Sequence, residues 1–267
     1  MNFIDKVALP FRSEVYGRLI ANKINIEFAV IGFPKCATTS IHKTLASSPN
    51  VYMPDFEVQV PSLARGWLKR PSNGIKLGIK NPNIMYEPHN FLALLKSNRN
   101  MKFIITMRNP TDWLFSFYQY RMLEIRKNKE WLKPILAKHP EFKNVTFADV
   151  VGEDKDFFGL SKKSGFFVDY LNEILNWVSP EQILILMTEE IAENATKAYE
   201  KIFQFLEIDK ENCLASGIEA NKNNMLYDNK CEFKDQLTIL ADFYKPKNKE
   251  LHDLLLTKWN YNNVYWQ

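Results

Sequence analysis

Short apolar segments alternate with stretches of helical spacing along most of the chain. Four segments have the length and the β-branched or apolar content of buried strands, and they cover residues 27–32, 76–80, 101–107 and 182–187. Helical patterns cover residues 38–47, the segment from residue 88 onwards, and residues 113–123, 164–178, 188–205 and 232–259. Asn109–Asp112 supplies a turn and a helix-start signal before the pattern at 113–123. This alternation is typical of an α/β fold with a central parallel sheet flanked by helices.

No internal repeat and no long linker interrupts the 267 residues. We therefore expect one domain over residues 1–267, with a core over about 28–206 and a helical C-terminal part over 207–267. The 46% hydrophobic and 25% charged residues exclude disorder as the main state. The three cysteines form no CxxC pair and support neither a disulfide scaffold nor a zinc ribbon. No segment has the apolar length of a membrane span or a signal peptide, so we expect a cytoplasmic protein.

The net charge of +4 is unevenly distributed. Between Val60 and Glu130, 13 lysine and arginine residues stand against four acidic residues, which gives a local excess of +9. Such an excess is typical of a site for anionic ligands, but solvated helix faces produce similar counts. The charge alone leaves both interpretations open.

The segment Gly32–Ser40 joins a predicted buried strand to a predicted helix. In this position, backbone N–H groups and the positive end of a helix converge on an anion. Lys35 adds a positive charge, and Thr38 and Thr39 add hydroxyl donors. The segment differs from a Walker A loop, because no second glycine precedes the lysine and Cys36 stands where the Mg²⁺-binding hydroxyl would follow it. The pattern favours a nucleotide site without a metal.

At these residues the chain resembles the sulfotransferases that use 3′-phosphoadenosine 5′-phosphosulfate (PAPS). Gly32–Thr39 is similar to that family's loop for the 5′-phosphosulfate, although Ala37 stands where many members have glycine, a departure that asks only that a methyl group be tolerated. Residues 103–110, a predicted strand followed by Arg108-Asn-Pro, resemble the family's 3′-phosphate signature, and Ser116 stands at the expected serine position. The resemblance implies a P-loop-like fold, PAPS as donor and adenosine 3′,5′-bisphosphate (PAP) as product. It also implies a nucleotide site at Lys35, Cys36, Ala37, Thr38, Thr39, Ser40, Arg108 and Ser116.

The resemblance is closer to the carbohydrate branch of the family, especially to the heparan sulfate N- and 3-O-sulfotransferase domains. Residues 56–60 resemble the acidic segment of those enzymes, and Gly78–Asn83 resembles their strand-end lysine segment. The likeness covers most of residues 28–205. The Lys-Gly-Arg loop of those enzymes is missing, and Asn221–Asn224 is the only counterpart. Lys222 is therefore the candidate that would complete the nucleotide site from the C-terminal part.

The resemblance also implies the catalytic roles. Lys35 would bind the 5′-phosphate and stabilise charge on the leaving oxygen. Glu57 matches the family's acidic position and would act as the general base, with Asp55 as the second choice. Lys80, at a predicted strand end, would contact both the sulfuryl group and the acceptor. His42 and His89 have no motif support as bases, and Cys36 is expected to pack within the loop.

The acceptor would be a hydroxyl or an amine, by resemblance that of a carbohydrate, and the alternative is a small alcohol or phenol. Arg65, Lys69, Arg70 and Arg121 are candidates to contact an anionic acceptor, and Trp67, Trp113 and Tyr118 are candidates to stack on sugar rings. Two other functions stay open. A Mg²⁺-dependent P-loop kinase would need an aspartate at a strand end, which no predicted strand has. A non-catalytic module would bind polyanions through the +9 region. We expect no nucleic-acid partner.

Overall fold

The computed structural model describes residues 3–68, 71–152, 156–159, 161–209, 230–262 and 265–266. These residues form two compact units. The first unit contains the described residues up to Met107 and those of 170–209, and the second contains the described residues of 108–169 and 230–266. Each unit is described separately.

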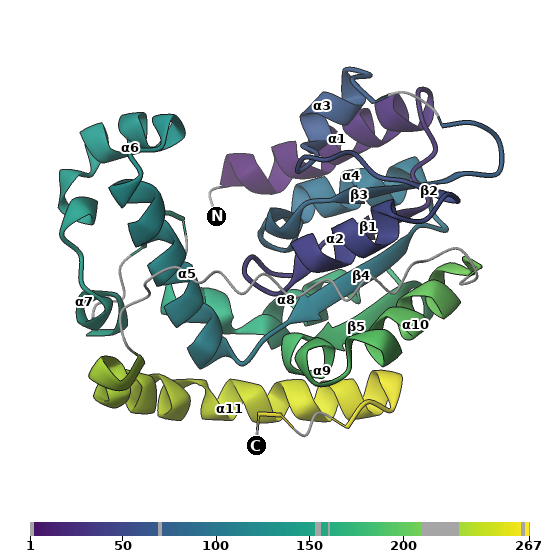
Figure 1. The fold of residues 1–267 in the computed structure, drawn as a ribbon. Helices are drawn as coiled ribbons and strands as arrows, with labels where there is room; N and C mark the ends of the chain where they lie inside the picture. Colours follow the sequence, from purple (N-terminus) through teal and green to yellow (C-terminus); the bar gives the residue numbers. More distant parts are fainter. Residues whose placement is uncertain are drawn as a thin grey trace. The chain divides into compact units, whose positions relative to one another are not determined.

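The first unit is built on a parallel sheet (Figure 1). Its strands are β1 (Phe28–Val30), β2 (Val51–Tyr52), β3 (Lys76–Lys80), β4 (Lys102–Met107) and β5 (Ile183–Met187), in the spatial order β2-β3-β1-β4-β5. All four pairings are parallel, which confirms the predicted fold class. In this register Val30 lies opposite Lys80 on one side and Ile104 on the other, so the carboxyl end of β1 lies next to Lys80.

The prediction missed β2, because two residues are too short for a periodic pattern. The other four strands were predicted, although β1 is shorter than the apolar run around it. Since β1 leads to β2 on one side of the sheet and β4 leads to β5 on the other, the strand order reverses between β1 and β4. Ligands of open α/β sheets bind outside the carboxyl ends of the strands at such a point.

Helices cover both faces of this sheet. They are α1 (Phe3–Ala21), α2 (Thr38–Ala46), α3 (Val60–Ala64), α4 (Pro88–Ser97), α9 (Thr188–Glu193) and α10 (Ala195–Leu206), with 3-10 turns η1 (Pro82–Tyr86) and η5 (Pro180–Gln182). Helix α8 (Phe167–Ile174) begins in the second unit and ends in the first. Among the described residues, no helix has the length and apolar character needed to cross a membrane.

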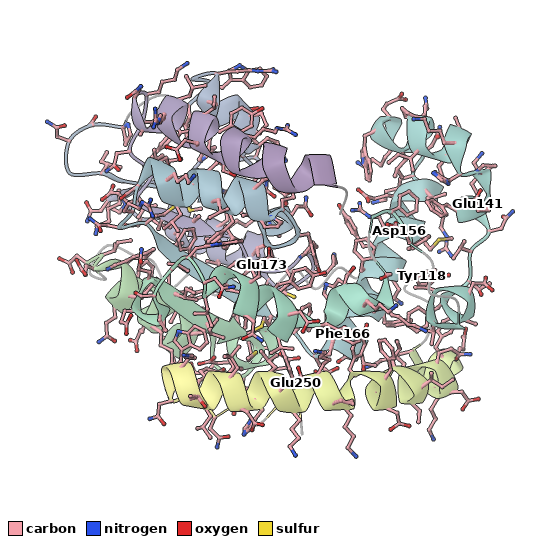
Figure 2. The ribbon with its side chains drawn as sticks, turned by 180° about the vertical axis from the view of Figure 1, so that it is seen from behind. Tyr118, Glu141, Asp156, Phe166, Glu173 and Glu250 are labelled. Carbon is pink, nitrogen blue, oxygen red and sulfur yellow. The ribbon has the colours of Figure 1, made fainter. Side chains whose placement is uncertain are left out.

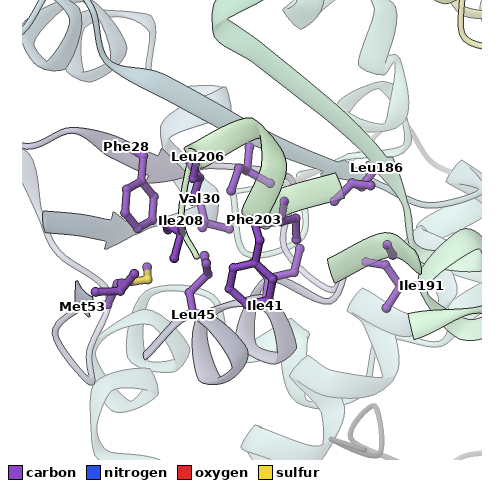
Figure 3. Close-up of a cluster of buried hydrophobic side chains, with 14 residues drawn as sticks. Phe28, Val30, Ile41, Leu45, Met53, Leu186, Ile191, Phe203, Leu206 and Ile208 are labelled. Atoms are coloured by element: carbon purple, nitrogen blue, oxygen red, sulfur yellow. The ribbon is translucent and has the colours of Figure 1, made fainter. Parts of the chain in front are cut away.

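The main core cluster lies between the sheet and helices α2 and α10 (Figure 3). Phe28 and Val30 of β1 contribute to it together with Ile41 of α2 and Phe203 of α10. The opposite face is covered by α4, where the ring centroid of Phe91 lies 4.7 Å from that of Phe103 in β4. Helix α1 packs on α4 from outside, with an ion pair of 2.6 Å between Glu14 and Lys96.

Two predicted helices differ from the structure. The helix expected over 188–205 is divided at Asn194, whose side-chain oxygen accepts a hydrogen bond from the Lys197 amide and starts α10 as a new helix. The helix expected over 164–178 begins later, because residues 162–165 form the 3-10 turn η4 (Lys162–Gly165) before α8, and it also ends earlier, at Ile174. Gly165 lies against the Tyr244 ring, where an added Cβ would lie 2.8 Å from ring atoms.

The second unit is helical. It contains α5 (Pro110–Arg126), α6 (Lys133–Lys138), α7 (Phe147–Gly152) and α11 (Lys234–Trp259), with 3-10 turns η2 (Glu130–Leu132), η3 (Pro140–Lys143), η4 and η6 (Lys230–Phe233). Its core is aromatic: the ring of Phe147 lies 5.0 Å from Phe115 and 5.5 Å from Phe233. Phe166 lies beside α11 (Figure 2) and stacks on Phe243 at 5.1 Å.

Candidate active site

The loop after β1 begins with a close approach to β4. Ile31 and Phe33 donate backbone hydrogen bonds of 3.0 Å to the carbonyls of Ile104 and Thr106, which extends the strand pairing beyond Val30. Between them, a Cβ on Gly32 would lie 2.7 Å from the Thr106 carbonyl oxygen and closer still to the Thr106 amide nitrogen. Only glycine leaves room for this contact, which fixes where the loop starts at the carboxyl end of the central strand.

The loop then turns through two left-handed residues. Lys35 has φ 65° and Ala37 has φ 61°, and Cys36 between them is fully buried. Helix α2 begins at Thr38, with Ala37 at the N-cap and no side-chain cap. The first amides of a helix have no intrahelical acceptor, and backbone turned in this way makes an anion-binding concavity. The geometry therefore suits an anion at the N-terminus of α2.

The backbone at Ala37 adds to what the resemblance implied. Room for a methyl group is not the only requirement, because φ 61° and ψ 13° lie in the left-handed region that glycine adopts without cost. The alanine at this position therefore carries backbone strain. The buried position of Cys36 agrees with its expected packing role.

Three aromatic rings hold the start of the loop. Phe33 is fully buried, and its ring centroid lies 5.5 Å from Tyr86 of η1 and 5.7 Å from Tyr170 of α8. Tyr86 and Tyr170 are themselves 5.0 Å apart in an edge-to-face arrangement. This cluster fixes the residue two positions before Lys35.

Lys80 connects two of the predicted site residues. Its Nζ atom lies 3.4 Å from the Thr39 hydroxyl and 3.7 Å from a carboxylate oxygen of Glu57. Lys80 is 7% exposed, whereas the Glu57 side chain is 43% exposed. An ammonium group held between a loop hydroxyl and an accessible carboxylate brings a positive charge and a proton acceptor to the same place.

In the second unit, Arg108 directly precedes the N-cap of α5. The Asn109 side chain accepts a hydrogen bond of 3.0 Å from the Thr111 amide, which starts the helix as predicted. Asp112 forms an ion pair of 2.5 Å with Lys230. Within the described part of the chain no ion pair of Arg108 is found. Arg108 and Ser116 are both half-buried.

Comparison with known protein families identifies the family of this chain. A model of the sulfotransferase domain matches residues 26–250. The chain belongs to the sulfotransferase family. The matched range covers most of the chain and includes the Gly32–Thr39 loop, Lys80 and Arg108.

The fold of this sulfotransferase is similar to two solved structures. A sulfotransferase from Alicyclobacillus acidocaldarius gives a TM-score of 0.65 at 16% identity, over 91% of this chain and 98% of that one. Mouse sulfotransferase SULT7A1, solved in complex with PAP, gives a TM-score of 0.50 at 16% identity, over 92% of this chain and 88% of that one. A sequence search of curated proteins gives no match.

The predicted acceptor contacts of the sulfotransferase divide into two groups. Trp113 is fully buried and Tyr118 is 5% exposed, so both belong to the core and are not surfaces for sugar rings. Arg121 forms an ion pair of 2.6 Å with Glu124 and lies 4.9 Å from the Phe117 ring centroid, which accounts for it structurally. In contrast, Trp67 is 70% exposed and Arg65 is also exposed. Lys69, Arg70 and Lys222 lie outside the described residues.

Some contacts of the sulfotransferase loop had no signal in the sequence. The Ser40 hydroxyl lies 2.7 Å from the hydroxyl of Tyr199 on α10, 159 residues further along. His42 lies 2.7 Å from the Pro54 carbonyl oxygen. The pKa of His42 is lowered, chiefly by burial. The described residues contain no group of three or more His, Cys, Asp or Glu side chains suited to a metal ion.

Proposed function

We propose that this sulfotransferase transfers the sulfuryl group of PAPS to a hydroxyl or amine of a carbohydrate acceptor and releases PAP. The observation that carries the proposal is the position of Lys80, which reaches both Thr39 of the anion loop and the Glu57 carboxylate. A donor-binding loop and a proton acceptor joined by one buried cation fit group transfer from an anionic donor.

The residues of the loop suit the 5′-phosphosulfate end of PAPS. Helix α2 has no side-chain cap, and the Ser40 amide already donates to the Ala37 carbonyl, so the amides of Thr38 and Thr39 are the ones that suit phosphate oxygens. We assign this end of the nucleotide to Lys35, Cys36, Ala37, Thr38, Thr39 and Ser40, with Cys36 and Ala37 acting through their backbone. Arg108 and Ser116 are assigned to the 3′-phosphate, because a guanidinium binds phosphate in a fixed, multidentate way.

The chemistry assigned to the side chains follows from their charges. When bound, PAPS supplies an activated sulfuryl group whose bond to the bridging phosphate oxygen breaks as the bond to the acceptor oxygen or nitrogen forms. Glu57 takes the proton that the acceptor loses. Lys35 stabilises the negative charge that develops on the leaving oxygen, and Lys80 stabilises charge at the sulfuryl group.

The carbohydrate acceptor is the finer part of the proposal. It rests on the resemblance of residues 56–60 and 78–83 to the heparan sulfate branch, and on two exposed aromatic side chains, one within residues 56–60 and one seven residues after them. Phe56 is 56% exposed and Trp67 is 70% exposed, and exposed rings of this kind stack on the apolar faces of sugars. A small alcohol or phenol is the alternative acceptor. We also propose that both units act as one sulfotransferase domain, since the family match runs through residues of both.

Titration calorimetry with PAP in the presence of EDTA tests the donor site. We expect micromolar or tighter binding that is unchanged by added Mg²⁺. Binding of ATP that requires Mg²⁺, without binding of PAP, would point to a kinase. Binding of heparin alone, lost at high salt and unaffected by Lys35→Ala and Glu57→Ala, would point to a polyanion-binding module. Incubation with ³⁵S-labelled PAPS and a panel of glycans, phenols and alcohols then identifies the acceptor class.

A further inference from the structure

The segment Pro54–Val58 carries Glu57, and we call it the acidic segment. It has no regular secondary structure. Residues Pro54–Val58 lie between β2 and α3, and Asp55, Phe56 and Glu57 are exposed. Such a segment has no ladder or helix to hold its backbone. The place of the Glu57 carboxylate therefore depends on the contacts at the two ends of the segment.

His42 holds the first end. Its Nε2 atom lies 2.7 Å from the carbonyl oxygen of Pro54. A carbonyl only accepts hydrogen bonds, so Nε2 carries the hydrogen and donates it. His42 is 6% exposed and belongs to α2, the helix whose N-terminus forms the anion loop. Burial lowers the pKa of the imidazole, which keeps it neutral at pH 7. This one bond joins the acidic segment to the loop helix.

Asn81 holds the second end. Its Nδ2 atom donates a hydrogen bond of 3.1 Å to the Val58 carbonyl, and the Val58 amide donates one of 3.0 Å to the Lys80 carbonyl. Asn81 is 1% exposed, and its Oδ1 atom accepts a bond of 3.0 Å from the Asn83 amide. The Asn81 backbone amide also donates to the Val30 carbonyl at 3.1 Å. The end of the segment is thus fixed to β3 and, through Asn81, to β1.

These contacts fix the position of Glu57 relative to Lys80 and to helix α2. The residue before Asp55 is tied to α2, the residue after Glu57 is tied to β3, and the Glu57 carboxylate lies 3.7 Å from the Lys80 ammonium. The two side-chain donors are buried and hold no other part of the acidic segment. Loss of the His42 donor would leave the buried Pro54 carbonyl without its partner and free the first end of the segment. Loss of the Asn81 donor would leave the Val58 carbonyl without its partner, while the bond from the Val58 amide to the Lys80 carbonyl remains.

We propose that His42 and Asn81 are positioning residues, which hold the Pro54–Val58 segment so that Glu57 meets the acceptor beside Lys80 and the donor loop. This inference rests on the proposed function, in which Glu57 is the general base. It predicts that loss of either donor lowers kcat without weakening nucleotide binding, because neither side chain is assigned a contact with the nucleotide.

A matched pair of variants isolates the His42 bond. The amide nitrogen of glutamine reaches about as far as Nε2, whereas that of asparagine reaches only as far as Nδ1. His42→Gln therefore retains a donor for Pro54, and His42→Asn removes it. Asn81→Asp tests the second end, because it keeps the acceptor for Asn83 and loses the donor to Val58. Thr44→Val is the control on α2, since the buried Thr44 hydroxyl has no hydrogen-bond partner among the described residues.

Three readouts decide the proposal: hydrogen–deuterium exchange of peptides covering residues 53–59, the Kd of PAP by calorimetry, and kcat with the KM of PAPS on the acceptor found with labelled PAPS. We expect His42→Asn to speed exchange in this segment and to lower kcat at least tenfold, and Asn81→Asp to do both to a smaller extent, with the Kd of PAP within twofold in each variant. His42→Gln and Thr44→Val should stay close to the parent protein. Unchanged exchange in His42→Asn, or equal losses of kcat in His42→Gln and His42→Asn, would overturn the proposal. Failure of the parent protein to bind PAP would instead overturn the proposed function.

Discussion

The Lys80 ammonium lies 3.7 Å from the Glu57 carboxylate, although the two residues are 23 positions apart and only one of them is buried. The contact arises because the acidic segment folds back onto the end of β3, where Lys80 is the last residue. A buried ammonium with only one exposed counter-charge contributes little net stability, because its desolvation offsets the attraction. This leaves two explanations for the pair, the proposed role of Lys80 in turnover and a role in folding.

Replacement of Lys80 separates these two explanations. We expect Lys80→Met to change the free energy of unfolding by less than about 1 kcal/mol, since an apolar side chain of similar length fills the space. Turnover of PAPS should fall by about 100-fold or more, whereas the Kd of PAP, which lacks the sulfuryl group, should change less than threefold. Lys76→Met, at the other end of β3, is the matched control. It removes a bond of 2.8 Å to the Leu206 carbonyl and should affect stability rather than turnover.

Substitutions in the proposed active site should distinguish residues needed for nucleotide binding from residues needed for turnover. Lys35→Ala and Arg108→Ala each remove a charge assigned to a phosphate group, so we expect the Kd of PAP to rise about 10- to 100-fold. Glu57→Gln removes the proton acceptor and should leave the Kd of PAP within twofold while kcat falls about 100-fold or more. Calorimetry and steady-state kinetics on the same preparations measure both. Full activity of Glu57→Gln on the true acceptor would refute the base assignment.

The elements around the site were predictable because each has a local pattern. The apolar run before Gly32, the Arg-Asn-Pro start of α5 and the strand ending at Lys80 all appear where the sequence indicated them. The hydrogen bond between His42 and the Pro54 carbonyl was not predictable, because the two residues meet through tertiary packing and neither belongs to a recognised motif. The same holds for Ser40 and Tyr199, which are 159 positions apart.

The charge count illustrates a second limit of the sequence. Several cations of the +9 region pair with acids from outside it, including Lys96 with Glu14 at 2.6 Å and Lys102 with Glu207 at 2.7 Å. Lys80 similarly faces Glu57. Such pairs cross-link elements of the first unit, so the local surplus overstates the positive charge available to a ligand. A net charge computed along the sequence cannot include partners that only the fold brings together.

Two histidines should make stability depend on pH. Burial lowers the pKa of His42 and of His89 below the ordinary value of 6.5. The unfolded chain therefore binds protons at a higher pH than the folded chain does. The stabilising effect of the neutral form is fully present above pH 6.5 and is lost as the pH falls through the lower, folded pKa values, with a slope of at most about 1.4 kcal/mol per pH unit for each histidine.

Urea unfolding between pH 7.5 and 5.5 measures this dependence. The free energy of unfolding should decrease across the lower half of that range. The double variant with His42→Gln and His89→Gln should show a smaller decrease, because the two groups no longer titrate. An identical pH dependence in the double variant would show that other groups are responsible.

The strain at Ala37 gives a substitution that should stabilise the protein. Ala37→Gly relieves a left-handed backbone that costs an alanine about 1 kcal/mol or more, and this gain exceeds the added flexibility of the unfolded chain. We expect the free energy of unfolding to rise by about 0.5–1 kcal/mol, with PAP binding retained. Ala46→Gly, in the last turn of the same helix, is the control and should destabilise by a similar amount. Destabilisation by both variants would mean that the loop relaxes around Ala37 at no cost.

Gly32 should tolerate no side chain, and its replacement should displace the loop as well as destabilise the fold. An alanine Cβ at this position would lie 2.7 Å from the Thr106 carbonyl oxygen and nearer to the Thr106 amide, so main-chain atoms of β4 would have to move. We expect Gly32→Ala to cost about 3 kcal/mol of unfolding free energy, at the upper end for overpacking, because backbone cannot rotate away as a side chain does. The start of the loop would shift with it, so the Kd of PAP should rise at least tenfold in the fraction that folds. Gly152→Ala, where an added Cβ meets nothing within 4 Å, should leave the Kd of PAP unchanged and should not destabilise the protein, because alanine at the end of α7 is a better helix former than glycine. If Gly32→Ala bound PAP as tightly as the parent protein, the close approach of β1 and β4 would not be what positions the loop.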